Sequence, residues 1–283
     1  MADLVRLEIR VPEHMQDMAT IAMVQQLNYG WEEENLPTGE VLYRVHIENP
    51  AFCEEFLTAL YSAVPEADVT RTDVPNQDWM KAWRDFFTPV KIGEHFKVIA
   101  PWMCEKEPLE GRTPIVIEPK TAFGTGHHPT TALCLASVSK LASEGRIHEG
   151  QKFLDLGTGS GILGIGCVKL GLSGVGVDID MLAIENTEEN KILNNVSSES
   201  FEVYQGSADA VCGDFDVVLA NILARPLMEM AVEIFKLVKP GGCLVLSGLL
   251  EIQADQVEAV YRDLGLPEAR RIVEGEWAAL IWE

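Results

Sequence analysis

Residues 153–161 read F-L-D-L-G-T-G-S-G, and this stretch decides the fold. An apolar run carries Asp155 and is followed by glycine at three alternate positions, Gly157, Gly159 and Gly161. Such a pattern is typical of a buried parallel strand that ends in a tight turn whose backbone approaches a ligand closely. Asp178 lies 21 residues beyond Gly157, after a second apolar run, where a carboxylate can hold the two hydroxyls of a ribose. The pair predicts a site for a nucleoside-containing cofactor.

The chain from residue 150 onward alternates short apolar strands with helical stretches. Strands are predicted at 152–156, 174–177, 215–220 and 242–247, with helices such as 162–169 and 181–194 between them. Strands separated by helices of this length indicate βαβ units and a parallel sheet, whose ligands lie at the carboxyl ends of the strands. We therefore predict an α/β, Rossmann-like domain over residues 118–283.

The first 75 residues show a different alternation, of the order β-α-β-β-α-β. The predicted strands are 4–11, 30–33, 40–48 and 67–74, and the predicted helices are 13–27 and 50–64. This order indicates a small ferredoxin-like α+β domain over residues 1–75. Residues 76–117 are then expected to be a linker, in which a helix at 76–87 places Trp79 and Trp83 on one face.

The composition limits the classes of protein to which the chain can belong. A chain of 283 residues that is 47% hydrophobic can form two domains with buried cores. Its formal net charge of −22 argues against direct nucleic-acid binding, which needs a positive surface. No apolar run is long enough to span a bilayer, the first ten residues have no signal-peptide core, and the six cysteines are scattered. We expect a cytoplasmic protein with no membrane partner.

The spacing of the glycines distinguishes between two cofactor classes. Dinucleotide-binding turns usually read G-x-G-x-x-G, whereas this turn reads G-x-G-x-G and follows the acidic Asp155. An acid beside the turn suits a cofactor that carries an ammonium group and no phosphate, as S-adenosylmethionine does. A nicotinamide cofactor, and with it an oxidoreductase, is the disfavoured alternative.

Two further segments carry candidate site residues. Asn221 follows the strand predicted at 215–220, a position at which amino-methylating enzymes hold the target nitrogen, although here Ile222 and Leu223 replace their prolines. Residues 122–131 read A-F-G-T-G-H-H-P-T-T, dense enough in Gly, Thr and His for a binding loop, and Thr130 and Thr131 are expected to cap the next helix. The adjacent histidines lack the spacing of helical zinc ligands, so no metal site is predicted.

Taken in order, these motifs resemble the bacterial PrmA family, methyltransferases of protein eleven of the large ribosomal subunit. The shared segments include the loop at 123–131, the glycine turn, V-D-I-D at 177–180, A-N-I-L at 220–223 and K-P-G-G at 239–242. The resemblance implies a ferredoxin-like substrate-recognition domain, a linker and a Rossmann-like catalytic domain of the class I methyltransferase type. It implies S-adenosylmethionine contacts at Thr131, Gly157, Asp178 and Asn221, with Gly159 in the same turn.

The reaction implied is transfer of a methyl group to amino groups, namely lysine side chains and the N-terminal amine of ribosomal protein eleven. Positioning would supply most of the catalysis, with Asn221 orienting the acceptor or the cofactor. No residue is assigned as the general base; His128 is a candidate, but a structural role in the loop is favoured. The alternatives are a lysine methyltransferase that acts on another protein and a module that binds the cofactor without catalysis. We expect a monomer.

Overall fold

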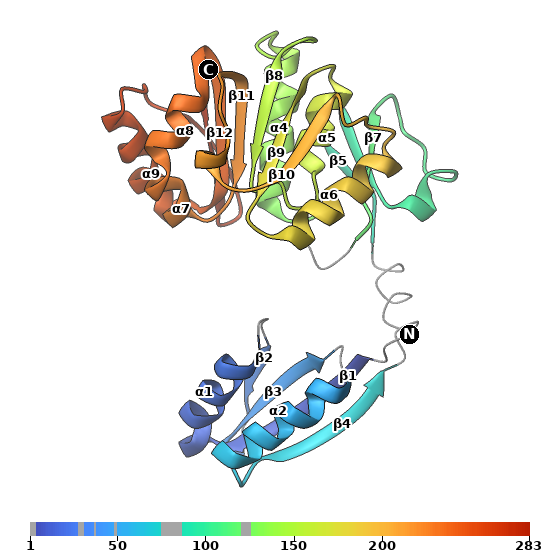
Figure 1. Cartoon of the computed structure of the whole chain (residues 1–283), viewed down its shortest axis with the longest axis vertical. Coiled ribbons are helices and arrows are strands. Elements are labelled where there is room, and N and C mark those ends of the chain that lie inside the picture. Colours follow the sequence, from blue (N-terminus) through green and yellow to red (C-terminus); the bar gives the residue numbers. More distant parts are fainter. Residues whose placement is uncertain (1–3, 28–30, 37, 48–49, 75–86, 120–125) are drawn as a thin grey trace. The chain divides into compact units, whose positions relative to one another are not determined.

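The computed structural model describes residues 4–27, 31–36, 38–47, 50–74, 87–119 and 126–283. It divides into two compact units, Met1–Phe87 and Thr88–Glu283. Figure 1 shows the first unit in colours from blue to cyan and the second in colours from green to red. Each unit has its own hydrophobic core.

The first unit confirms the predicted ferredoxin-like order. Its elements are β1 (Leu4–Pro12), a 3-10 turn (Glu13–Met15), α1 (Gln16–Gln26), β2 (Glu32–Asn35), β3 (Glu40–Ile47), α2 (Pro50–Ala63) and β4 (Asp68–Val74). The strands form an antiparallel sheet of order β2-β3-β1-β4. Alternate residues of β1, such as Leu7 and Ile9, are fully buried, as are Met23 of α1 and Phe56 of α2 in the same core. The period of two in the sequence therefore sets which face of the sheet meets the helices.

The second unit is built on a seven-stranded sheet of order β10-β9-β8-β11-β12-β14-β13. The strands are β8 (Lys152–Leu156), β9 (Ser173–Asp178), β10 (Phe201–Gln205), β11 (Phe215–Asn221), β12 (Val238–Leu250), β13 (Arg270–Glu274) and β14 (Trp277–Trp282). The first five in the spatial order are parallel, whereas β14 runs antiparallel to β12 and pairs with β13 in a hairpin. The strand order reverses between β8 and β11, which is where ligands bind in open parallel sheets.

Helices cover both faces of this sheet (Figure 1). One face carries α4 (Pro129–Ser143), α5 (Ile162–Lys169) and α6 (Met181–Leu193). The other carries α7 (Ala224–Glu229), α8 (Ala231–Leu237) and α9 (Glu251–Asp263). Because both faces are covered, the central strands are apolar on both sides, and their side chains alternate between two separate buried clusters. This is why the sequence shows these strands as continuous apolar runs.

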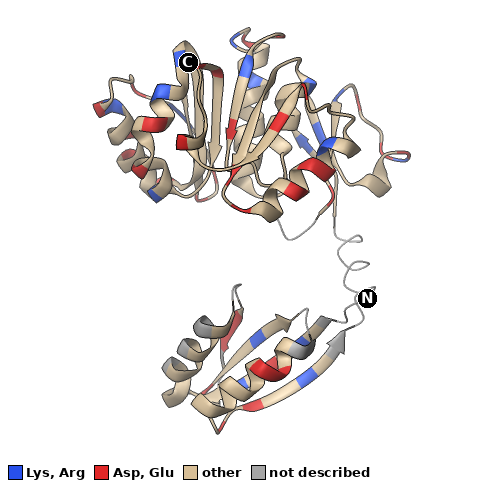
Figure 2. Ribbon diagram, in the orientation of Figure 1, with Lys and Arg blue, Asp and Glu red and all other residues tan. Residues whose placement is uncertain are grey.

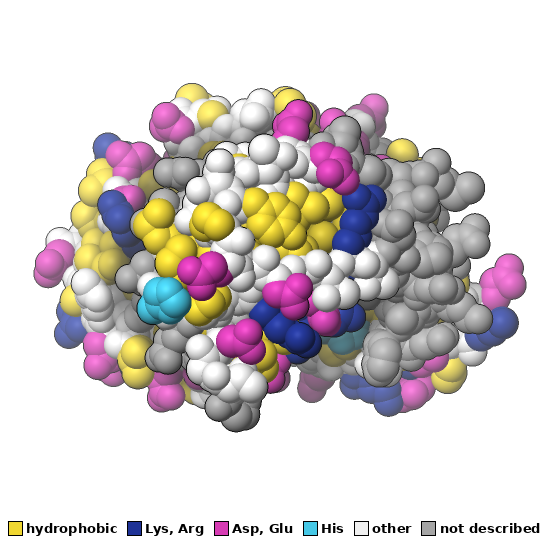
Figure 3. All heavy atoms as spheres, turned by 90° about the horizontal axis from the view of Figure 1, so that it is seen from below, with side chains coloured by type: hydrophobic (Ala, Val, Ile, Leu, Met, Phe, Trp, Pro, Cys, Tyr) yellow, Lys and Arg dark blue, Asp and Glu magenta, His cyan; other side chains and the backbone are white. Residues whose placement is uncertain are grey.

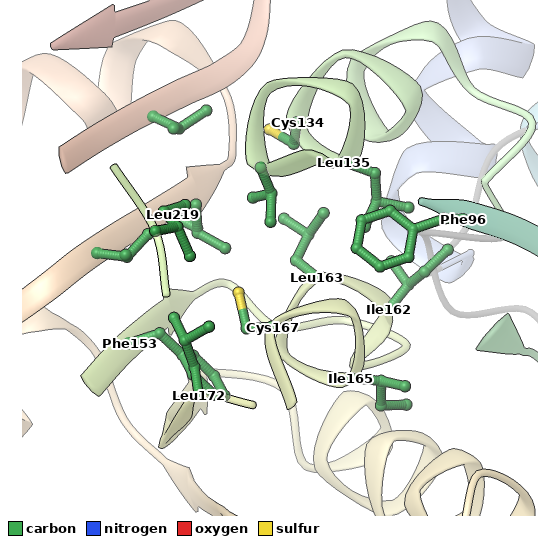
Figure 4. Packing of buried hydrophobic residues seen from close by; sticks show 14 of the residues in the cluster. Phe96, Cys134, Leu135, Phe153, Ile162, Leu163, Ile165, Cys167, Leu172 and Leu219 are labelled. Carbon is green, nitrogen blue, oxygen red and sulfur yellow. The ribbon is translucent and has the colours of Figure 1, made fainter. Parts of the chain in front are cut away.

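The segment expected to connect the domains instead contributes to the second unit. It forms β5 (Val90–Ile92), β6 (Phe96–Ile99), a 3-10 turn (Pro101–Met103) and β7 (Thr113–Val116), which pair as a small sheet of order β5-β6-β7. Phe96 lies beside Leu135 of α4 and Ile162 of α5 (Figure 4). All four residues of β6 are buried, so this segment is part of the core and no free linker. The predicted helix with Trp79 and Trp83 lies outside the described residues.

Charged side chains of both signs are distributed over the chain (Figure 2). The face shown in Figure 3 likewise carries acidic, basic and hydrophobic side chains next to one another. Within the part of the chain that the structure describes, no helix combines the length and the apolar character needed to cross a bilayer.

Candidate cofactor site

The register of the sheet places three predicted site residues at one edge. Leu156 of β8 pairs with Val177 of β9, and Ala220 of β11 pairs with the same Leu156. The next residue on each strand is therefore Gly157, Asp178 or Asn221, and these three lie at the same level beyond the paired positions. Because the strands are parallel, this level is their carboxyl edge, where the strand order reverses.

The glycine turn requires glycine for two reasons. Gly157, Gly159 and Gly161 have φ angles of 74°, 56° and 77°, in the left-handed region that residues with a Cβ atom rarely adopt. A Cβ on Gly157 would also lie 2.4 Å from Ile222 Cγ2, and one on Gly161 would lie 2.6 Å from Thr187 Cγ2. Only glycine permits both the backbone conformation of this turn and its close approach to neighbouring side chains.

Asp155 fixes the inside of this turn. Its side chain is completely buried, and its Oδ2 accepts hydrogen bonds from Thr158 Oγ1 at 2.8 Å and from the Gly164 amide at 3.1 Å. Burial raises the pKa of this carboxyl to about 6, against the lowering effect of the two donors. Oδ1 is buried and has no hydrogen-bond partner within the described part of the chain. Since the carboxylate is enclosed, it holds the turn, and its charge acts on a ligand only through space.

Asp178 is oriented by the backbone around it. Its Oδ2 accepts from the Gly159 amide at 2.9 Å, and its Oδ1 accepts from the Asp180 amide at 3.0 Å. The side chain is only partly buried, and a carboxylate has about four acceptor positions, so each oxygen keeps capacity for another donor. The arrangement fits two vicinal hydroxyls of a ribose. It also links the acid after β9 directly to the glycine turn after β8.

Thr131 and Asn221 meet although 90 residues separate them. Asn221 Nδ2 donates to Thr131 Oγ1 at 3.2 Å, which joins the first turn of α4 to the end of β11. Asn221 Oδ1 is buried and has no hydrogen-bond partner among the described residues. A buried acceptor without a donor is costly, and such an atom at a binding site is suited to a ligand's N–H group. The structure therefore brings together Thr131, Gly157, Gly159, Asp178 and Asn221, all the residues predicted for this site.

The expected capping by Thr130 and Thr131 is wrong. The N-cap of α4 is His128, whose Nδ1 accepts from the Thr130 amide, and Pro129 occupies the first position of the helix. Proline has no amide to satisfy and a preset φ, so the helix begins two residues earlier than the threonines suggested. The His128 ring also packs edge-on against Trp277, with 4.8 Å between the ring centroids. These contacts support the structural role that was favoured for His128.

Gly248 was missed in the sequence. It has a φ of 86°, and a Cβ there would lie 2.3 Å from the backbone oxygen of Ile222. The glycine lets β12 pass close to the segment that carries Asn221, because nothing but hydrogen fits between the two backbones. The signal that could have revealed it is the isolated glycine in the apolar run at 244–250.

The fold and the site together define a class I methyltransferase that depends on S-adenosylmethionine. Five parallel strands, a final antiparallel hairpin and a glycine turn beside an acid at the end of the next strand make up its framework. A family model described as ribosomal protein L11 methyltransferase (PrmA) matches residues 12–283, and the chain belongs to this family.

Individual relatives agree with this assignment. A protein of Myxococcus xanthus named ribosomal protein L11 methyltransferase is 39% identical over 243 residues, which are 86% of this chain and 81% of that protein. One of the same name from Geobacter metallireducens is 41% identical over 82% of this chain and 74% of its own length. The crystal structure of a ribosomal protein L11 methylase from Lactobacillus delbrueckii subsp. bulgaricus matches with a TM-score of 0.61 at 27% identity, over 70% of this chain and 98% of that one. The oxidoreductase alternative is therefore set aside.

Proposed function

We propose that this enzyme transfers methyl groups from S-adenosylmethionine to amino groups of ribosomal protein L11, namely lysine side chains and the N-terminal amine. The match of the L11 methyltransferase family over nearly the whole chain supports the substrate. The observation that supports an amine acceptor is Asn221, whose buried Oδ1 accepts no hydrogen bond from any residue that the structure describes, although its Nδ2 donates to Thr131. An amine brings the N–H group that this atom lacks.

The residues at the carboxyl edge would act by positioning. Bound S-adenosylmethionine supplies an electrophilic methyl group on a sulfonium centre. The Asp178 carboxylate would accept hydrogen bonds from the ribose hydroxyls, and the backbone at Gly157 and Gly159 would lie against the cofactor. Asn221 Oδ1 would accept an N–H of the neutral acceptor amine and so aim the nitrogen's lone pair at the methyl group. Such alignment can supply about 7–11 kcal/mol of the barrier in a displacement reaction.

We further propose that residues 1–75 recognise the protein substrate, while residues 118–283 carry the cofactor and the chemistry. All the proposed cofactor contacts belong to the second unit, whereas the first unit is a separately cored ferredoxin-like module. The chain has 44 acidic and 22 basic residues, and α6 displays several of the acids (Figure 2). A negative surface complements a lysine-rich protein and speeds their encounter. The enzyme is proposed to act as a monomer in the cytoplasm, without contacting nucleic acid.

The test is mass spectrometry of purified L11 after incubation with the enzyme and isotopically labelled S-adenosylmethionine. Labelled methyl groups are expected on lysines and on the N-terminal amine. Another ribosomal protein that contains lysines, treated in the same way, serves as the control and should remain unlabelled. Labelling of the control protein but not of L11 would overturn the substrate assignment and leave a methyltransferase of another protein.

A further inference from the structure

Helix α6 has a polar buried face, which is unusual for a helix that packs against a core. Three of its side chains, Thr187, Asn190 and Asn194, recur at intervals of three and four residues and are almost completely buried. Asn194 is the C-cap residue of the helix. Asparagine is a weak helix former because its side chain competes for backbone groups, so buried asparagines in a helix need partners elsewhere. We call these three residues the polar face of α6.

The first partner of the polar face is the glycine turn. Thr187 Oγ1 donates to the Gly159 carbonyl at 3.0 Å, and Asn190 Nδ2 donates to the Ser160 carbonyl at 2.8 Å. These two carbonyls belong to the turn that would seat the cofactor. Carbonyl groups in this turn lie outside the hydrogen-bond ladders of helix and sheet, so side-chain donors satisfy them instead. The conformation of the turn therefore depends on α6 as well as on Asp155.

The second partner is the chain that leaves β7. Asn190 Oδ1 accepts from the Glu118 amide at 3.0 Å, so a single amide group bridges Glu118 and Ser160. Asn194 binds both backbone groups of Val116, accepting from its amide at 2.9 Å and donating to its carbonyl at 2.6 Å. The chain continues from Glu118 to Thr131, which contacts Asn221. Asn190 thus contacts both the cofactor turn and the chain just beyond β7.

We propose that Asn190 is a positioning residue for the cofactor site, which ties the glycine turn to the backbone at Glu118, just beyond β7. It does not lie at the carboxyl edge with Asp178 and Asn221, and it acts through the backbone of the turn. Its hydrogen bonds use both ends of one rigid amide: Oδ1 accepts from Glu118, while Nδ2 donates to Ser160 and, at 3.3 Å, to Asn186 Oδ1 on the same helix. One side chain therefore links the turn to residue 118. Asn194 holds the same strand without touching the turn.

The matched pair Asn190→Leu and Asn194→Leu separates positioning from plain stability. Both positions are buried on the same helix and each loses an amide that binds residues 116–118, but only Asn190 contacts the turn. Binding of S-adenosylhomocysteine is measured by calorimetry on the full chain, well below each variant's unfolding temperature. Asn190→Leu is expected to raise the Kd about tenfold, the effect of losing one buried hydrogen bond from the turn, with Asn194→Leu within about twofold of the parent.

Asn190→Asp is the second variant. It keeps the shape of the side chain, so it should disturb folding less than Asn190→Leu does. Its carboxylate still accepts from the Glu118 amide but cannot donate to the Ser160 carbonyl while ionised. At pH 8 the Kd of this variant for S-adenosylhomocysteine is expected to be higher than that of the parent. Protonation of the new carboxylate at lower pH restores a hydrogen-bond donor. The affinity of the variant relative to the parent should therefore recover as the pH falls. Equal Kd changes at positions 190 and 194, or parental affinity of Asn190→Asp at pH 8, would overturn the proposal. Binding of S-adenosylhomocysteine needs no acceptor protein, so this result is independent of the proposed L11 substrate.

Discussion

Replacing Gly157 by alanine tests the geometry of the cofactor turn most directly. The residue has a φ of 74°, where a side chain costs about 1–2 kcal/mol. The new Cβ would lie 2.4 Å from Ile222 Cγ2, an overlap of the kind that costs about 1–3 kcal/mol in a packed site. Ile222 is β-branched and stiff at χ1, so this methyl group cannot swing aside freely. The two effects together predict a loss of about 2–5 kcal/mol in the free energy of unfolding.

The two contributions can be separated by a double-mutant cycle in urea denaturation. Ile222→Ala removes the methyl group that clashes, so the overlap disappears in the double variant while the backbone strain remains. The double variant should therefore be more stable than the sum of the single changes predicts, by about 1–3 kcal/mol. Additivity within about 0.5 kcal/mol would show that Gly157 and Ile222 are not in contact, and the described turn would be refuted.

Three further outcomes are expected. Asp155→Asn keeps an oxygen for Thr158 and Gly164. Because the folded pKa of Asp155 is about 6 against an ordinary 3.8, the folded parent holds a proton that the unfolded chain releases. Its unfolding free energy relative to the variant should therefore fall by roughly 2 kcal/mol as the pH rises from about 4 to about 7. A flat difference in denaturation between those pH values would contradict this. Asp178→Ala should weaken S-adenosylmethionine binding by about 1–3 kcal/mol in calorimetry, and unchanged affinity would remove the ribose assignment. Removing residues 1–75 should leave cofactor binding intact and abolish L11 methylation; retained methylation would refute their role in recognition.

Local patterns in the sequence predicted the framework of the site. The glycines at alternate positions after an apolar run indicated the turn, and the spacing to Asp178 indicated the next strand end, because both follow from the backbone of one βαβ unit. The sequence predicts a connecting segment at 90–117 because the charged stretch at 105–114 interrupts its apolar runs. In the structure the segment forms three strands, and β6 and the end of β7 are buried because α4 and α5 pack on them. Nothing within the segment shows that helices later in the chain will cover its strands.

The pairing of Thr131 with Asn221 shows what sequence patterns leave open. The residues next to each of them in the sequence predict that it belongs to the site. Their contact, however, depends on the register of β11 between β8 and β12. Ala220 pairs with Leu156 and Asn221 pairs with Ser247, which places the Asn221 side chain toward α4. Side chains alternate along a strand, so a shift of one residue would turn Asn221 to the opposite face and leave Thr131 without this partner. The same register keeps Asn221 level with Gly157 and Asp178. The geometry of the site is therefore determined by how the strands pair. The sequence motifs predict only which residues belong to the site.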